Sequence, residues 1–251
     1  MNLRPVILAA TALLPSLSFA QTAAEHILAG DKERTAMNAS GALAHYQEAI
    51  AADPNNGEAL WRASREAVDL GEFNDQMRDS LYRLGELYAR RAVQASPNSS
   101  MAHFALAKAL GRRALSLGKR DQVKYASEVH KEAHEAIRLD STNAGALHVL
   151  GMWNASIMRL NGIERFFAKN VLGGKVFGEA NWDDAARYLE RSATLEPDRI
   201  VHHLDLGGVY ADRGQTAQAR AQYQMALRLQ PLEYDDRFYQ QQAQRALNDL
   251  R

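Results

Sequence analysis

The sequence predicts an all-α fold in which pairs of helices stack into a solenoid. Three observations predict it. The stretch from Ile200 to Pro231 carries small and large apolar residues at the offsets of a two-helix repeat. A helix-ending segment with Pro or Asx residues recurs upstream, around Pro54, Pro97, Ser141 and Pro197. No stretch shows the sustained period-two alternation that is typical of a strand.

The stretch 200–231 matches the 34-residue tetratricopeptide pattern of a helix, a turn and a second helix. Small residues in that pattern let the two helices approach closely, so we expect Gly207 to face Tyr223. Proline cannot continue a helix, so we expect the second helix to end after Leu229, ahead of Pro231. The predicted fold is therefore a tetratricopeptide-like α-solenoid of about four helix pairs within residues 40–231.

Residues 1–20 have the pattern of a secretory signal peptide. Arg4 precedes an apolar run from Val6 to Leu17, and Ser18-Phe19-Ala20 supplies small residues before a cleavage point. The run is shorter than the roughly 20 residues that span a bilayer; an uncleaved anchor is the alternative. We therefore expect a soluble, periplasmic or secreted protein whose mature chain begins at Gln21.

The elements follow in order from this ruler. Residues 21–39 are expected to be a leader that runs into a first helix, and residues 40–52 the second helix of a repeat, because Tyr46 and Pro54 have the mutual offset of Tyr223 and Pro231. Three helix pairs are then predicted before the last repeat: 57–70 with 74–94, 100–117 with 121–139, and 144–160 with 181–195. Glycines are expected at the turns inside the pairs, at Gly71, Gly118, Gly162 and Gly214.

Two segments depart from the regular pattern. Residues 162–180 are an insertion in which aromatic and aliphatic residues alternate with Arg165, Lys169 and Lys175. We expect a short extra helix over the core there; a membrane-surface segment or a loop that gates a ligand is the alternative. Residues 232–251 are predicted to form a capping helix, because a solenoid otherwise exposes the apolar face of its last repeat.

Composition excludes several classes of function. Thirty basic and thirty acidic residues give zero net charge, which provides no global field for nucleic acid. The absence of cysteine excludes disulfides, thiol catalysis and thiolate zinc sites. His130 and His134 lie four apart, but Lys131 stands where a zinc protease needs its glutamate, so we expect surface histidines. We predict no catalytic residues, no cofactor and no metal site.

Four short stretches carry a more specific pattern: EALWRA at 58–63, ALHVLGMW at 146–153, RFFAK at 165–169 and AARYL at 185–189. The His-x-x-Gly-x-Trp spacing followed by a basic and apolar insertion resembles the tetratricopeptide-like domain of the regulator of microtubule dynamics protein family. The resemblance implies a non-enzymatic protein that associates with microtubules or organelle contact sites, and one human member binds phospholipid through this domain. The signal peptide indicates an exported, bacterial-type relative without a microtubule partner, and Gly173-Gly174 replaces the family's proline-containing turn.

The first helices of stacked pairs line the concave side of a solenoid. Transferring the repeat offsets predicts an apolar groove with a few cations, lined by Trp61, Arg65, Phe104, Lys108, His148, Met152 and Leu204. Such a groove suits a peptide or protein partner with an acidic group, which makes the chain a binding scaffold. Phospholipid binding in the same groove is the alternative function, with membrane contact through residues 162–180. Trp61 and Phe104 as plain core residues are the structural alternative.

Overall fold

The computed structural model describes residues 21–170 and 175–250. The expected signal peptide and the Gly173-Gly174 pair lie outside the described residues. Among the described helices, none combines the length and the apolar character needed to cross a bilayer.

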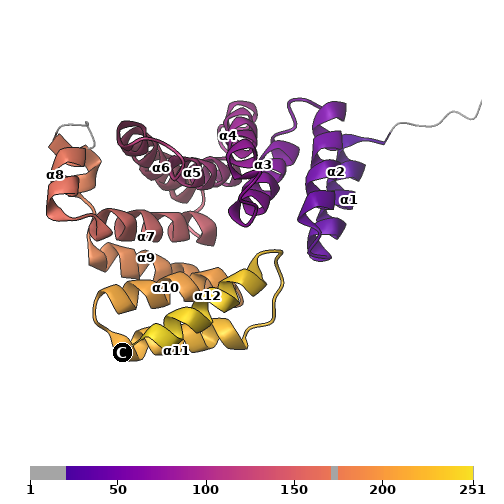
Figure 1. Cartoon of the computed structure of the whole chain (residues 1–251). Helices are drawn as coiled ribbons and strands as arrows, with labels where there is room; N and C mark the ends of the chain where they lie inside the picture. Colours follow the sequence, from indigo (N-terminus) through magenta and orange to yellow (C-terminus); the bar gives the residue numbers. More distant parts are fainter. Residues whose placement is uncertain (1–20, 171–174, 251) are drawn as a thin grey trace, which may run out of the picture.

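Helices account for all regular structure in the described part of the chain, which contains no strand (Figure 1). This confirms the prediction of an all-α, tetratricopeptide-like solenoid. The elements are α1 (Ala23–Thr35), α2 (Ala39–Ala52), α3 (Gly57–Glu72), α4 (Arg78–Ala95), α5 (Ser100–Ala114), α6 (Lys119–Leu139), α7 (Ala144–Arg159), α8 (Gly162–Asn170), the 3-10 helix η1 (Lys175–Gly178), α9 (Trp182–Leu195), α10 (Ile200–Asp212), α11 (Thr216–Arg228) and α12 (Asp236–Asp249).

Neighbouring helices pack in pairs: α1 on α2, α3 on α4, α5 on α6, α7 on α9 and α10 on α11. The pairing of α7 with α9 leaves α8 and η1 as an insertion within that hairpin. The α1–α2 hairpin adds a pair to the four expected, because Gly30 allows close packing that a weakly patterned, Ala-rich sequence does not announce. A Cβ atom on Gly30 would lie 2.5 Å from Cε1 of Tyr46, so that ring lies directly on the backbone of α1.

The recurring polar segments that end one pair also start the next. The side chain of Asn56 accepts a hydrogen bond from the backbone N–H of Ala59 at 3.0 Å, and Asn143 does the same for Ala146 at 2.9 Å. Such caps satisfy one of the N–H groups left open at a helix start. One short segment thus ends one helix and starts the next.

The glycines include both correct predictions and a wrong one. Gly207 faces Tyr223 as expected, since an added Cβ atom would lie 2.6 Å from Cε1 of that ring. Gly214 marks a turn with a φ of 72°, a conformation that favours glycine. The turn predicted at Gly71 is wrong: α3 continues to Glu72, and Gly71 is instead the small residue on which Tyr82 packs.

The first helices α3, α5, α7 and α10 contact one another in succession and form what we call the inner face. The last helix, α12, packs on α10 and α11. In Figure 1 the connection between α11 and α12 also reaches toward the N-terminal helices, so the curved stack brings its two ends together.

Candidate functional site

All seven residues predicted to line a groove lie on the four helices of the inner face. Trp61 and Arg65 come from α3, Phe104 and Lys108 from α5, His148 and Met152 from α7, and Leu204 from α10. The first six are partly exposed, whereas Leu204 is buried beside Tyr239 and Ala243 of α12. The structure therefore brings the predicted residues to one surface, and α12 covers one end of it.

Trp61 and Arg65 form a stacked pair at the start of this surface. The guanidinium of Arg65 lies 5.2 Å from the centroid of the indole, and its Nε donates to Oε1 of Glu66 at 3.0 Å. Burial, together with the nearby Arg34 guanidinium, lowers the pKa of Arg65. Arg65 is thus held by an aromatic face and a carboxylate of its own chain.

Lys108 is paired as well. Its ammonium lies 2.5 Å from Oδ1 of Asp69 on α3. Burial alone would raise the pKa of Asp69, but the charges of Lys108 and Arg34 hold that pKa below its ordinary value. The expected cations are present, but each is neutralised within the protein.

Phe104 and His148 connect successive hairpins. The Phe104 ring covers Gly145, where an added Cβ atom would lie 2.4 Å from Cζ of the ring. Nε2 of His148 lies 2.8 Å from Oδ2 of Asp205 on α10, and the His148 ring lies 4.9 Å from that of His202. Phe104 and His148 therefore help to hold hairpin against hairpin while keeping part of their surface exposed.

A segment near the C-terminus, residues 232–239, joins the two ends of the stack, and we call it the closing segment. Glu233 forms ion pairs with Arg34 at the end of α1 and with Arg199 before α10. The ring of Phe238 stacks on Phe73 with centroids 4.2 Å apart, and the hydroxyl of Tyr239 donates to Glu72 at 3.1 Å.

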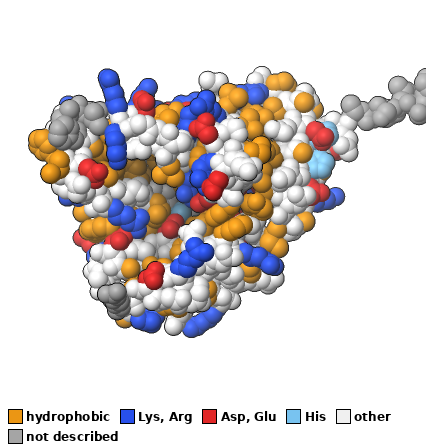
Figure 2. Space-filling view, in the orientation of Figure 1, with side chains coloured by type: hydrophobic (Ala, Val, Ile, Leu, Met, Phe, Trp, Pro, Cys, Tyr) orange, Lys and Arg blue, Asp and Glu red, His pale blue; other side chains and the backbone are white. Residues whose placement is uncertain are grey.

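Asp236 fixes the shape of the closing segment, since its Oδ2 accepts the backbone N–H groups of Leu232 and Glu233 at 2.8 Å each. The neighbouring Asp235 is buried, and this burial, with the negative charge of Asp69, raises its pKa to about 7. Figure 2 shows the resulting mixture of basic and acidic side chains around a recess near the middle of this face. The inner face is thus charged and internally paired, where the sequence predicted a mainly apolar groove with free cations.

The insertion contains a helix, as expected. Phe177 is buried and meets Trp153 edge to face at a centroid distance of 5.9 Å, so η1 covers the core. On α8, by contrast, Ile163 is 75% exposed and Phe166 is 61% exposed. The insertion therefore combines the core-covering role with a partly apolar outer surface.

The histidines separate into structural residues and two clusters. Nε2 of His103 and of His203 lies 2.9 Å and 2.8 Å from the carbonyl oxygens of Pro97 and Pro197, so each ties the start of its helix to the preceding segment. His202 contacts Ser192 and His148 instead, which confirms that His202 and His203 point in different directions. Burial lowers the pKa of His202 to about 2.

His130 and His134 form the first cluster, with their Nε2 atoms 3.2 Å apart and the His130 ring against Trp153. The second cluster, His26, His45 and Glu48, was not singled out from the sequence. Its members come from two helices, and only the short spacing of His45 and Glu48 within α2 gave any signal.

Comparisons with known proteins agree with the architecture. The sequence profile of the family described as Regulator of microtubule dynamics protein 1-3 matches residues 21–251. The chain is 24% identical to Regulator of microtubule dynamics protein 1 of Mus musculus over 159 residues, which cover 62% of this chain and 52% of that protein. For the Bos taurus protein of the same name the identity is 25% over 169 residues, with 66% and 51% covered. The chain thus spans about half the length of these relatives.

Among solved structures, a thermophilic TPR protein of Thermus thermophilus superposes with a TM-score of 0.61 at 20% identity, covering 88% of this chain and 98% of that one. Pseudomonas aeruginosa PilF superposes with a TM-score of 0.51 at 14% identity, covering 91% of each chain. At these identities the likeness concerns the fold.

Proposed function

Because this chain belongs to the regulator of microtubule dynamics protein family, we propose that it is a non-enzymatic binding protein whose inner face holds a protein or peptide partner. The observation that carries the proposal is the row of partly exposed side chains from successive first helices: Trp61, Phe104, His148 and Met152. Stacked hairpins present such rows as extended binding surfaces.

The charges of the inner face indicate what kind of partner fits. Arg65 pairs with Glu66, and Lys108 pairs with Asp69, so both donors and acceptors lie next to the exposed aromatic rings. A polypeptide offers backbone N–H and C=O groups together with apolar side chains, and it can satisfy such a mixed surface. We therefore propose a peptide segment that lays apolar side chains on Trp61 and Phe104 and exchanges hydrogen bonds with the paired charges.

The test uses the whole protein and two matched variants. Trp61→Ala combined with Phe104→Ala removes the inner-face rings, whereas Leu87→Ala truncates a side chain of α4 that is 53% exposed. A partner captured by crosslinking from envelope extract is identified by mass spectrometry, purified and titrated calorimetrically. We expect the inner-face variant to weaken binding at least about tenfold, as for truncation of interface aromatic anchors, and the α4 variant to leave Kd unchanged. Equal affinities for the two variants, with helix content retained by circular dichroism, would place the partner elsewhere.

Phospholipid binding is the second candidate, and α8 is the feature that favours it. Ile163 and Phe166 are exposed there, beside Arg165 and Lys169, a combination suited to the surface of an anionic membrane. Native mass spectrometry of the purified protein would show lipid-sized mass additions under this proposal and none under the first. Ile163→Asn should then reduce cosedimentation with anionic vesicles, and an undiminished vesicle-bound fraction would contradict it.

We also propose that the protein is exported, on the basis of the signal-peptide pattern in residues 1–20. N-terminal sequencing of protein recovered from a periplasmic or culture fraction should begin at Gln21. Recovery of the uncleaved chain from the cytosol would contradict the proposal.

A further inference from the structure

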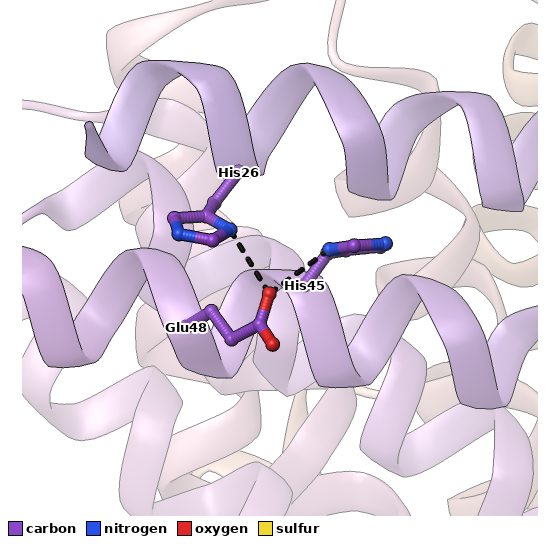
Figure 3. Close-up of side chains that lie close together, drawn as sticks. All are labelled: His26, His45 and Glu48. Atoms are coloured by element: carbon purple, nitrogen blue, oxygen red, sulfur yellow. Dashed lines mark hydrogen bonds and ion pairs between the residues drawn. The ribbon is translucent and has the colours of Figure 1, made fainter. Parts of the chain in front are cut away.

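The N-terminal hairpin brings two imidazoles and one carboxylate together on its surface. His26 lies on α1, whereas His45 and Glu48 lie one helical turn apart on α2. Nδ1 of His26 is 2.9 Å from Oε2 of Glu48, and Nδ1 of His45 is 3.1 Å from the same oxygen. Figure 3 shows the three side chains converging between the two helices.

Hydrogen bonds within the cluster do not satisfy all of its atoms. Nδ1 of His26 is a buried atom without a hydrogen bond, because its short distance to Glu48 lacks hydrogen-bond geometry. A neutral imidazole has one donor nitrogen and one acceptor nitrogen. The carboxylate oxygen can therefore accept from both rings only if both carry their proton on Nδ1; otherwise lone pairs face one another. A cation between the three atoms removes this conflict.

We propose that His26, His45 and Glu48 bind a divalent transition-metal ion of the zinc type. Two imidazole nitrogens and one carboxylate oxygen form a common zinc ligand set, whereas calcium and magnesium prefer oxygen ligands alone. Zinc bonds of roughly 2.0–2.2 Å place neighbouring tetrahedral ligands roughly 3.3 Å apart. The ligand atoms here all lie within 4.8 Å of one another, so small side-chain rotations reach that geometry.

Solvent completes the coordination. The side chains of His26, His45 and Glu48 are 15%, 34% and 54% exposed, which leaves water free to occupy a fourth position. Within the described residues, this is the group of three His or acidic side chains that meets the distance requirement; the His130–His134 pair has no third ligand as close. A bound ion would connect α1 to α2 and stabilise the first hairpin of the stack.

The experiment titrates zinc chloride into the chelator-treated full-length protein by isothermal titration calorimetry. We expect one saturable site in the wild type, and an affinity at least about tenfold weaker in His45→Asn and in Glu48→Gln, because loss of even an outer-shell partner costs that much. His134→Asn is the matched control, since it removes one histidine of the other cluster, and its affinity should equal that of the wild type. Zinc X-ray absorption of the loaded protein should show two imidazole ligands.

Each result decides the question. Affinity lost in the His45 and Glu48 variants and kept in the His134 variant supports the site; Glu48 is exposed, so its substitution leaves the core untouched. The proposal is overturned by the absence of saturable binding, by equal affinity in all variants, or by loss in the His134 variant alone. None of these outcomes bears on the inner face, so the metal site and the proposed binding function stand or fall separately.

Discussion

At the scale of single residues, two buried groups give the stability of this protein opposite responses to pH. Burial raises the pKa of Asp235 to about 7, above its ordinary value of 3.8, so from about pH 4 to 7 the folded state holds a proton that the unfolded state has released. Burial lowers the pKa of His202 from 6.5 to about 2, so between these values the unfolded state holds the extra proton. As pH rises, Asp235 therefore decreases the free energy of unfolding and His202 increases it.

Asp235→Asn tests this opposition. The asparagine does not titrate, so the variant should become more stable with rising pH between about 4 and 6.5, where the two effects offset each other in the wild type. Relative to the wild type, its free energy of unfolding should be higher at pH 8 than at pH 4 by a difference on the order of 4 kcal/mol at most, the value that corresponds to the raised pKa of Asp235. Urea unfolding at several pH values measures it, with the exposed Asp198→Asn as control. Parallel pH profiles for wild type and Asp235→Asn would contradict the prediction.

His202 gives a second prediction of this kind. In His202→Asn, the loss of stability on acidification from pH 6.5 to 4 should be smaller than in Asp235→Asn, because no buried imidazole then resists protonation. The same unfolding series compares the single variants and the double variant. A steeper acid loss in His202→Asn would show that other groups control this range.

Residue patterns predicted local roles better than distant partners. Gly207 against Tyr223 followed from offsets within one repeat, and the structure confirms it. The pairing of Lys108 with Asp69 was missed, because those residues lie on neighbouring hairpins and no periodicity connects them. His26 and His45 escaped notice for the same reason: their proximity depends on how α1 packs on α2.

At the scale of elements, glycines set how closely the helices of a pair approach. Gly207 and Gly208 are adjacent in α10 but differ in surroundings. A Cβ atom on Gly207 would lie 2.6 Å from the Tyr223 ring, whereas on Gly208 the nearest atom is the guanidinium of Arg159 at 3.6 Å. The same substitution therefore meets a packed ring at one position and the end of a flexible side chain at the other.

Gly207→Ala should lower the free energy of unfolding by about 1–3 kcal/mol, because the buried ring of Tyr223 must shift. Gly208→Ala should be neutral or stabilising by up to about 1 kcal/mol, since alanine suits a helix interior better than glycine. Chemical denaturation of both variants against the wild type provides the measurement. Equal losses at the two positions would mean that helix approach does not control this hairpin.

Helix positions followed from the sequence more closely than helix ends did. The expected helix at 57–70 continues through Gly71 to Glu72, because that glycine packs against Tyr82 and does not turn the chain. The leader expected in residues 21–39 contains α1, which is paired with α2 through Gly30 and Tyr46. In both cases contact with a neighbouring helix decided the structure of a stretch whose own pattern was weak.

At the scale of the whole molecule, Phe73 and Phe238 join regions far apart in the chain. A double-mutant cycle with Phe73→Ala and Phe238→Ala should give a coupling free energy of about 0.5–1.5 kcal/mol, the range for an aromatic pair in contact. Pairing Phe73→Ala with Ile163→Ala, which truncates an exposed residue of α8, is the control and should give no coupling. Additive effects of the two phenylalanine substitutions would mean that the stacked rings contribute nothing to joining the ends.

The closing segment was beyond the reach of sequence reasoning. The repeat pattern predicted a terminal helix that caps the last hairpin, and α12 does pack on α10 and α11. That Glu233 also meets Arg34 depends on the curvature of the entire stack, to which every hairpin contributes. Curvature is a sum of small rotations between neighbours, and no single repeat encodes it.

The ion pair between Arg34 and Glu233 has a consequence for how the chain unfolds. In an open array of repeats each unit touches only its neighbours, so terminal units fray alone and unfolding spreads inward from either end. Here the first and last units are themselves neighbours, and neither can fray without breaking contacts with the other. Amide hydrogen exchange should accordingly report similar protection for α1 and α12, and slow, concerted opening in place of gradual fraying at the termini.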